Sequence, residues 1–499
     1  MKKIASASAI YILKAILHGL VGGFIILVVF GILHLNNRPD LSVWHTEFLD
    51  EEFTRKSELT SFDEYLALEK RLFKQLDQLV YNQVPPDEEN IINRFTRDSI
   101  ADPDRWPRNW NHSFELAHDQ PRAGVLLLHG LSDSPYSLRA IGETLNEAGA
   151  HVVGLRIPGH GTAPSGLVHT KWQDMAAAVE LAMAHLKQKV NDQPIHLVGY
   201  SNGAALAVHY ALDQIENPVL PQVDSIVLLS PEIAITPFAA LAIWQQRVGA
   251  VLGLKKLAWT DILPEYDPYK YNSFPTNAGT LARRITIANH DRLVRLSKQN
   301  KLEAFPRLLT FQSAIDATVS APAVVSVLYD HLPDNGHQLV VFDLNRFTAV
   351  EPLLKSDPLH EIYELLKKDD RTFTFHLLAN KSEESKDLIV RTWPPGQAET
   401  VDADTDLQWP ADVYSLTHIS LPFRGDDPLY GGDNPLPSPG IQLGNMAFQG
   451  ERGVLVVSAA SLLRLRWNPF YSFVEPRILR HFRLDGPEAI LQTPPAPPR

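Results

Sequence analysis

The chain has 499 residues, of which 44% are hydrophobic and 21% are charged, a composition typical of a globular protein with a sizeable core. Its formal net charge of −12, with no dense run of Lys and Arg, argues against nucleic acid as a partner. The absence of cysteine excludes disulfides, thiolate metal ligands and thiol nucleophiles, and leaves serine, carboxylate or metal-bound water as candidate catalytic groups.

The N-terminal region contains a long apolar run, AILHGLVGGFIILVVFGIL, at 15–33. A helix of this length nearly crosses a hydrocarbon core of about 30 Å, so residues 1–38 are predicted to form a single-pass membrane anchor. A cleaved signal peptide is the alternative, but no small-residue cleavage site follows the run. Three lysines precede the run and only Arg38 follows closely, so we expect the body on the non-cytoplasmic side, in the periplasm if the source is Gram-negative.

Residues 39–110 are polar and rich in acids and helix formers, as in FDEYLALEKRLFKQLDQLV at 62–80. Several prolines punctuate the segment. We interpret it as a helical stalk or packing arm, and a spacer role is favoured over any chemical one.

From Ala123 the chain alternates between apolar runs and stretches with helical spacing. The apolar runs AGVLLL, HVVGL, IHLVGY and SIVLL show no alternation of hydrophobic and polar residues, which is typical of strands buried on both faces. Strands separated by helices imply right-handed crossovers in a parallel sheet. Residues 111–490 are therefore predicted to form a doubly wound α/β domain.

Two insertions interrupt this alternation. Residues 231–305 are rich in apolar and aromatic side chains and are predicted to form a helical cap over the carboxyl end of the sheet, or else a peripheral helical subdomain. Residues 346–410 form a second insertion, and the Pro-rich tail 491–499 is predicted to be disordered.

The sequence Gly-Tyr-Ser-Asn-Gly occupies the junction between one predicted strand and the next helix. A G-x-S-x-G pattern arises by chance in many chains, so its context decides its meaning. In a tight turn from strand to helix, Gly199 and Gly203 avoid steric clashes while Ser201 is exposed with a strained backbone. Ser201 is therefore predicted to be a nucleophile.

The region 123–418 resembles the α/β-hydrolase fold. The His-Gly pair after the first strand, PGHG, the G-x-S-x-G turn and QSAID are most similar to the monoacylglycerol lipase, lysophospholipase and carboxylesterase branch. The resemblance implies an oxyanion hole formed by the main-chain N–H groups of Leu131 and Asn202, and a chain order of serine, acid, histidine. The stretch 346–410 lies outside the shared pattern.

The acid should end the strand that follows the cap, and Asp316 does so. Asp330, Asp334 and Asp343 lie where solvated or capping roles are more typical.

The histidine should lie in a loop beyond the last core strand. His418 fits this requirement, with His360 as the next candidate. Because the family's histidine usually follows its acid more closely, His418 requires the intervening residues to form an insertion.

These residues predict a membrane-anchored serine hydrolase that cleaves carboxylic, lipidic esters through an acyl-enzyme intermediate. A serine peptidase, amidase or thioesterase of the same fold is the alternative, and so is a non-catalytic binding protein. No cofactor or metal is expected, because the acidic stretch 424–435 lacks EF-hand spacing and favours a solvated turn. The sequence leaves the oligomeric state, acyl chain length and leaving group open.

Overall fold

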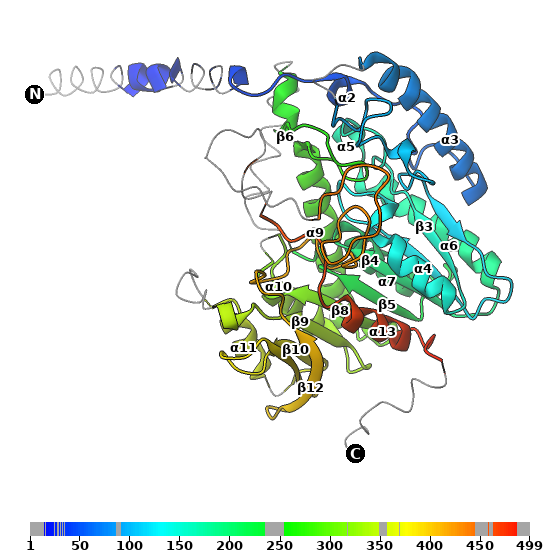
Figure 1. Cartoon of the computed structure of the whole chain (residues 1–499), viewed down its shortest axis with the longest axis vertical. Helices are drawn as coiled ribbons and strands as arrows, with labels where there is room; N and C mark the ends of the chain where they lie inside the picture. Colours follow the sequence, from blue (N-terminus) through cyan, green and yellow to red (C-terminus); the bar gives the residue numbers. More distant parts are fainter. Residues whose placement is uncertain are drawn as a thin grey trace, which may run out of the picture.

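A computed structural model describes residues 14–486 except 15, 24, 27, 28, 30, 32, 34, 86–90, 235–253, 317, 349–356, 369, 445–457 and 459–462. Its centre is a ten-stranded sheet with the order β1-β3-β2-β4-β5-β8-β9-β10-β11-β12 (Figure 1). The strands are β1 (Phe114–Leu116), β2 (Ala123–Leu128), β3 (Ala150–Leu155), β4 (Ile195–Tyr200), β5 (Ser225–Leu229), β8 (Arg307–Ser313), β9 (Gln338–Phe342), β10 (Thr374–Asn380), β11 (Asp387–Trp393) and β12 (Val401–Gln408).

The sheet is parallel from β3 through β10, and only its edge strands β1, β11 and β12 pair antiparallel. Strands β2 to β5 are buried along their whole length, as their unbroken apolar runs predict. The predicted doubly wound, mostly parallel sheet is confirmed.

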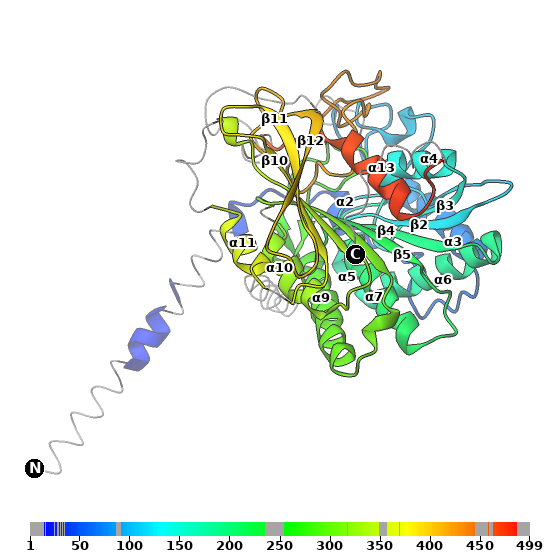
Figure 2. The ribbon, with the colours of Figure 1, turned by 90° about the horizontal axis from the view of Figure 1, so that it is seen from below.

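Helices cover both faces of the sheet (Figure 2). One face packs against α6, α7 and α9, and the other packs against α4 and α13, so each face has its own hydrophobic core. The longer body helices are α4 (Arg139–Glu147), α6 (Trp172–Val190), α7 (Asn202–Glu216), α9 (Thr276–Lys298) and α13 (Tyr471–His481), and the shorter ones are α5 (Gly166–His169), α10 (Ala321–Val327) and α11 (His360–Leu366).

The N-terminal region divides into a projecting helical segment and an arm that lies on the body. Among the described residues no helix is both long and apolar enough to cross a bilayer, and the predicted span 15–33 lies partly outside them. In the arm, α2 (Val43–Thr46) precedes α3 (Phe62–Leu79). Helix α3 starts at a capping box between Ser61 and Glu64, and its apolar side packs against α6.

The first insertion is only partly described, because 235–253 lie outside the described residues. The rest contains a short hairpin, β6 (Trp259–Asp261) and β7 (Phe274–Pro275), followed by α9. Helix α9 buries Leu281, Ile285 and Leu293 in the same core as α7. It is therefore the crossover helix between β5 and β8, whereas the sequence predicts a cap over this stretch.

The second insertion extends the sheet. Strand β10 adds parallel to β9, and β11 and β12 follow as an antiparallel meander. Residues 346–410 thus continue the central sheet at its edge, with α11 beside it (Figure 1).

Candidate active site

Ser201 lies in a sharp turn between β4 and α7. Its backbone has φ 53° and ψ −115°, a left-handed conformation that costs a non-glycine residue strain. A Cβ at Gly199 would lie 2.5 Å from the Cα of Ala204, and one at Gly203 would lie 2.0 Å from the carbonyl oxygen of Leu128. Only glycine therefore fits at the two flanking positions, and the turn holds the serine at the carboxyl edge of the sheet.

The structure brings Ser201, Asp316 and His418 together. The Nε2 atom of His418 lies 3.0 Å from Ser201 Oγ, and its Nδ1 atom lies 2.8 Å from Asp316 Oδ2. All three groups are buried, and the carboxyl of Asp316 is fully so. This is the geometry of a nucleophile, a base and an acid that orients the base.

The carboxyl of Asp316 is held in its ionised form. Burial alone would raise its pKa, but His418, through its hydrogen bond and through the charge it carries when protonated, and the backbone N–H groups of Val319 and Thr318 outweigh burial and lower the pKa. An ionised Asp316 accepts a hydrogen bond from His418 Nδ1–H, and the proton stays on Nδ1. This bond leaves Nε2 unprotonated and able to accept the serine proton.

The second insertion explains how His418 reaches Ser201 across 102 residues from Asp316. The insertion begins after Asn345, and the chain returns to that residue at its end. The Asn345 N–H donates to Tyr414 O at 2.7 Å and its Nδ2 donates to Val413 O at 2.9 Å. The hydroxyl of Ser313, at the end of β8, donates to Leu416 O at 2.9 Å. The loop that carries His418 is therefore held beside the carboxyl ends of β8 and β9.

Comparison with known proteins agrees with this architecture. Residues 125–253 match a family described as alpha/beta hydrolase fold. A thermostable monoacylglycerol lipase from Bacillus sp. (strain H-257) is 33% identical over 117 residues, which cover 23% of this chain and 44% of that protein. The chain has an α/β-hydrolase fold. The predicted resemblance to the monoacylglycerol lipase branch is confirmed, over less than half the length of that relative.

Two solved structures of lipases match less than half of the chain. A monoacylglycerol lipase from Paleococcus ferrophilus is 18% identical, with a TM-score of 0.35 over 46% of this chain and 88% of that one. A soluble variant of monoglyceride lipase from Saccharomyces cerevisiae is 14% identical, with a TM-score of 0.34 over 46% of this chain and 81% of that one.

The two predicted oxyanion-hole residues follow neighbouring strands of the α/β-hydrolase sheet. Asn202 is the first residue of α7, where a helical N–H has no carbonyl partner in its own helix. Leu131 follows His129 and Gly130 after β2, which pairs with β4. The Nε2 atom of His129 accepts from Ile157 N–H at 3.1 Å, and burial lowers the pKa of this histidine well below its usual range. A neutral His129 thus fixes the turn that carries Leu131.

The alternatives to the predicted triad lie elsewhere in the structure. His360 begins α11 within the second insertion. Asp330 pairs with Lys368, and Asp343 pairs with Arg346 at 2.7 Å. In the described part of the chain, the histidine that bonds Ser201 is His418.

Sequence reasoning missed Glu232. It follows β5, the strand next to β4, and its carboxyl accepts from Asn202 Nδ2 at 3.1 Å. Burial raises the pKa of this carboxyl. The available signal was its position just past an apolar strand adjacent to the strand that carries the nucleophile.

The sequence of the acid-rich stretch 424–435 favours a solvated turn. In the structure the stretch is partly buried. Asp427 is buried and accepts from Tyr136 Oη at 2.9 Å and from Arg139 Nη2 at 2.8 Å. Within the described ranges, no group of three or more His, Asp or Glu side chains is arranged to hold a metal ion. The two hydrogen bonds of Asp427 tie the stretch 424–435 to the segment that follows β2.

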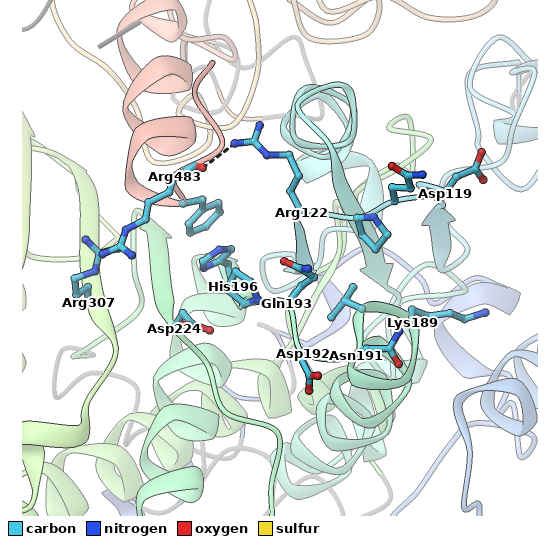
Figure 3. A pocket seen from close by; sticks show the side chains of 15 residues that line it. Asp119, Arg122, Lys189, Asn191, Asp192, Gln193, His196, Asp224, Arg307 and Arg483 are labelled. Atoms are coloured by element: carbon cyan, nitrogen blue, oxygen red, sulfur yellow. Dashed lines mark hydrogen bonds between the residues drawn. The ribbon is translucent and has the colours of Figure 1, made fainter. Parts of the chain in front are cut away.

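A cavity of about 930 Å³ lies at the amino ends of the strands, opposite the carboxyl ends where Ser201 lies (Figure 3). Its lining includes His196, Asp224 and Arg307, at the amino ends of β4, β5 and β8. Ligands of open α/β sheets bind beyond the carboxyl ends of the strands. The Arg122 guanidinium in this cavity donates to the carbonyls of Arg483 and Leu484, so it fastens the segment after α13 to the body.

Proposed function

We propose that the protein is a serine hydrolase that cleaves carboxylic esters through an acyl-enzyme intermediate. The observation that carries this proposal is the hydrogen-bonded series Asp316–His418–Ser201, with separations of 2.8 and 3.0 Å on a strained strand-to-helix turn. The fold and the local similarity to a lipase support the same reaction class.

In the proposed reaction, Ser201 Oγ attacks the ester carbonyl and gives its proton to His418 Nε2. Asp316 stabilises the imidazolium that forms. The N–H groups of Leu131 and Asn202 donate to the developing oxyanion, where one donor is worth about 2.7–4 kcal/mol. The leaving alcohol then takes the proton from Nε2 and the acyl group remains on Ser201, until a water molecule, deprotonated by His418, releases the acid.

Hydrophobic acyl groups are the substrates that we propose. Two aromatic side chains come shortly after proposed site residues in the sequence: Tyr136 lies five positions after Leu131, and Phe423 lies five positions after His418. Both belong to one buried cluster. An apolar cluster of this kind suits a lipidic chain, and the matched relative is named as a monoacylglycerol lipase.

A membrane anchor at 15–33 is part of the proposal, with the body on the non-cytoplasmic side. The described helical residues of this run project from the body beside β6 (Figure 1), and their large apolar side chains are exposed. Directly after them, Arg38 donates to the carbonyls of Trp259 at 2.8 Å and Lys256 at 2.9 Å, which fixes the helix to the body. Retention of the full chain in alkali-washed membranes would support the anchor, and release into the soluble fraction would contradict it.

Replacement of the nucleophile tests the catalytic proposal. Ser201→Ala should keep the thermal unfolding midpoint near that of the wild type, yet abolish hydrolysis of a chromogenic short-chain ester and labelling by a fluorophosphonate probe. Ser382→Ala, an exposed serine, serves as the matched control. Turnover that survives in Ser201→Ala would overturn the assignment, and a wild type that neither labels nor turns over would favour a binding protein.

The close alternative is a serine peptidase, amidase or thioesterase, since the fold hosts all of these activities. A panel of esters of increasing chain length, run beside aminoacyl amides and thioesters, separates them. We expect the highest kcat/KM for esters with long acyl chains.

A further inference from the structure

Glu232 makes two hydrogen bonds to the nucleophile turn. Its N–H donates to Ser201 O at 3.1 Å, and its Oε2 accepts from Asn202 Nδ2 at 3.1 Å. The tip of β5 is thus joined to the tip of β4 through both the backbone and the side chain of one residue.

Burial of the Glu232 carboxyl in this position is energetically unfavourable. It is buried with a single side-chain hydrogen bond, whereas a buried charge normally needs full pairing to offset its lost hydration. An apolar side chain of similar size would close the two strand tips at lower cost in stability. The carboxyl therefore points to a task other than folding.

That task is indicated by its two neighbours. Asn202 supplies one of the proposed oxyanion donors, and its side chain is held by Glu232. Burial raises the pKa of Glu232, while the Asn202 hydrogen bond and the nearby charge of His418 act in the opposite direction. Glu232 bonds the main chain of Ser201, whose Oγ lies 3.0 Å from His418 Nε2. Asp316 bonds the Nδ1 atom of the same ring. Both carboxyl groups are thus joined to the Ser201–His418 pair.

We propose that Glu232 is a positioning residue for the hydrolytic reaction, which fixes Asn202 at the oxyanion site and adds a second negative charge near the His418 imidazolium. The inference rests on the proposed function. When Ser201 gives its proton to His418, a cation forms in a buried site, and a fixed negative group there lowers the barrier. The same carboxyl keeps the Asn202 main chain in the orientation that the oxyanion requires.

Three substitutions separate the two effects. Glu232→Gln keeps the size and an oxygen acceptor for Asn202 but removes the charge. Glu232→Asp keeps the charge but draws it back from Asn202. Glu232→Leu removes both, and Glu303→Gln, an exposed acid, is the matched control.

The measurements are kcat and KM for a soluble chromogenic ester from pH 4 to 9, beside fluorophosphonate labelling and thermal unfolding. We expect Glu232→Gln to lower kcat about tenfold with KM within about twofold, a barrier change of about 1.4 kcal/mol. The acidic limb of its kcat/KM profile should move to lower pH, because protonation of His418 loses a favourable neighbour. Glu232→Asp should lose kcat without that shift, and Glu232→Leu should lose the most.

Wild-type kcat and an unmoved pH profile in both Glu232→Gln and Glu232→Asp would overturn the inference. A rise in KM alone would also overturn it, because it would make Glu232 a substrate contact. If Glu232→Leu does not fold, the other two variants decide. Failure of the proposed function is distinguishable, since the wild type would then show no Ser201-dependent turnover or labelling.

Discussion

Two buried carboxyls near His418 have opposite pKa shifts, and the reason lies in their donors. Asp316 accepts from His418 Nδ1 and from Gln312 Nε2, while the N–H groups of Thr318 and Val319 complete its set. Glu232 accepts from one side-chain donor. Hydrogen bonds to the ionised form therefore outweigh burial at Asp316 but not at Glu232. In the proposed reaction, Asp316 would orient His418 and Glu232 would position Asn202.

Replacement of Asp316 by Asn should remove the orienting function without removing the fold. The amide can donate to His418 Nδ1, which favours the tautomer with the proton on Nε2, and that nitrogen then cannot accept from Ser201. We expect kcat to fall by about 10⁴-fold. Steady-state kinetics on the short-chain ester, with thermal unfolding alongside, measures both effects. Asp334→Asn, an exposed acid in the same region, should retain wild-type kcat, and loss below tenfold in Asp316→Asn would contradict the role.

Elements differ in how far the sequence determines them. Strands β2, β4 and β5 could be predicted because runs without hydrophobic and polar alternation need burial on both faces. Ser201 could be predicted because it directly follows β4, and Asp316 because it follows β8, the strand after the first insertion. Strand β12 could not, because VDADTDLQ is acidic and mostly exposed and is held by pairing with β11. Its pairing includes the ion pair between Arg391 and Asp402 at 2.9 Å.

Tertiary context decided the remaining parts of the site. Glu232 is part of the site only because β5 ends beside β4, and this adjacency is a property of the folded sheet. His418 could be proposed only on the assumption of an insertion, and the structure supplies that insertion as sheet strands whose ends meet at Asn345. The sequence predicts a cap where α9 lies because residues 231–305 interrupt the strand–helix alternation and are rich in apolar and aromatic side chains.

The loop that carries His418 depends on its contact with the end of β8. Ser313→Ala removes the donor to Leu416 O, and a buried carbonyl left without a partner costs about 1–3 kcal/mol. We expect the free energy of unfolding to fall by about that amount, and kcat to fall roughly tenfold as the loop loosens. Ester kinetics and amide hydrogen exchange at 413–418 report the two effects. Ser326→Ala, whose hydroxyl is exposed, should change neither, and unaltered exchange in Ser313→Ala would show that the loop is held by other contacts.

The arm joins the molecule through a buried cluster of charges. Arg156 follows β3 and is fully buried, and its guanidinium bonds both oxygens of Glu52 at 3.0 Å and Glu69 Oε2 at 3.0 Å. The phenol of Tyr65 donates to Arg156 O at 2.6 Å. Because both acids come from the arm, the body has an uncompensated buried cation without it. The arm and the body should therefore unfold as one unit.

Removal of one charge from this cluster should destabilise the whole molecule in a pH-dependent way. Burial alone would raise the pKa of Glu69, but the His112 hydrogen bond and the Arg156 charge outweigh it and lower the pKa below its ordinary 4.5. A carboxyl with a lowered folded-state pKa stabilises the fold above the unfolded-state value, and this contribution is lost as the pH falls through the folded-state value. Glu69→Gln should therefore cost about 3 kcal/mol near pH 7.

Urea unfolding of the wild type and Glu69→Gln between pH 7 and pH 3 measures this difference. The difference in unfolding free energy should be constant down to about pH 4.5. It should shrink below that pH, because the Glu69 carboxyl of the unfolded wild type then begins to take up a proton while the folded one stays ionised. Asp63→Asn removes an exposed charge from the same helix and should cost less than about 1 kcal/mol. A gap that is independent of pH would assign the loss to packing of the side chain, and two separate unfolding transitions in the wild type would show that the arm unfolds independently of the body.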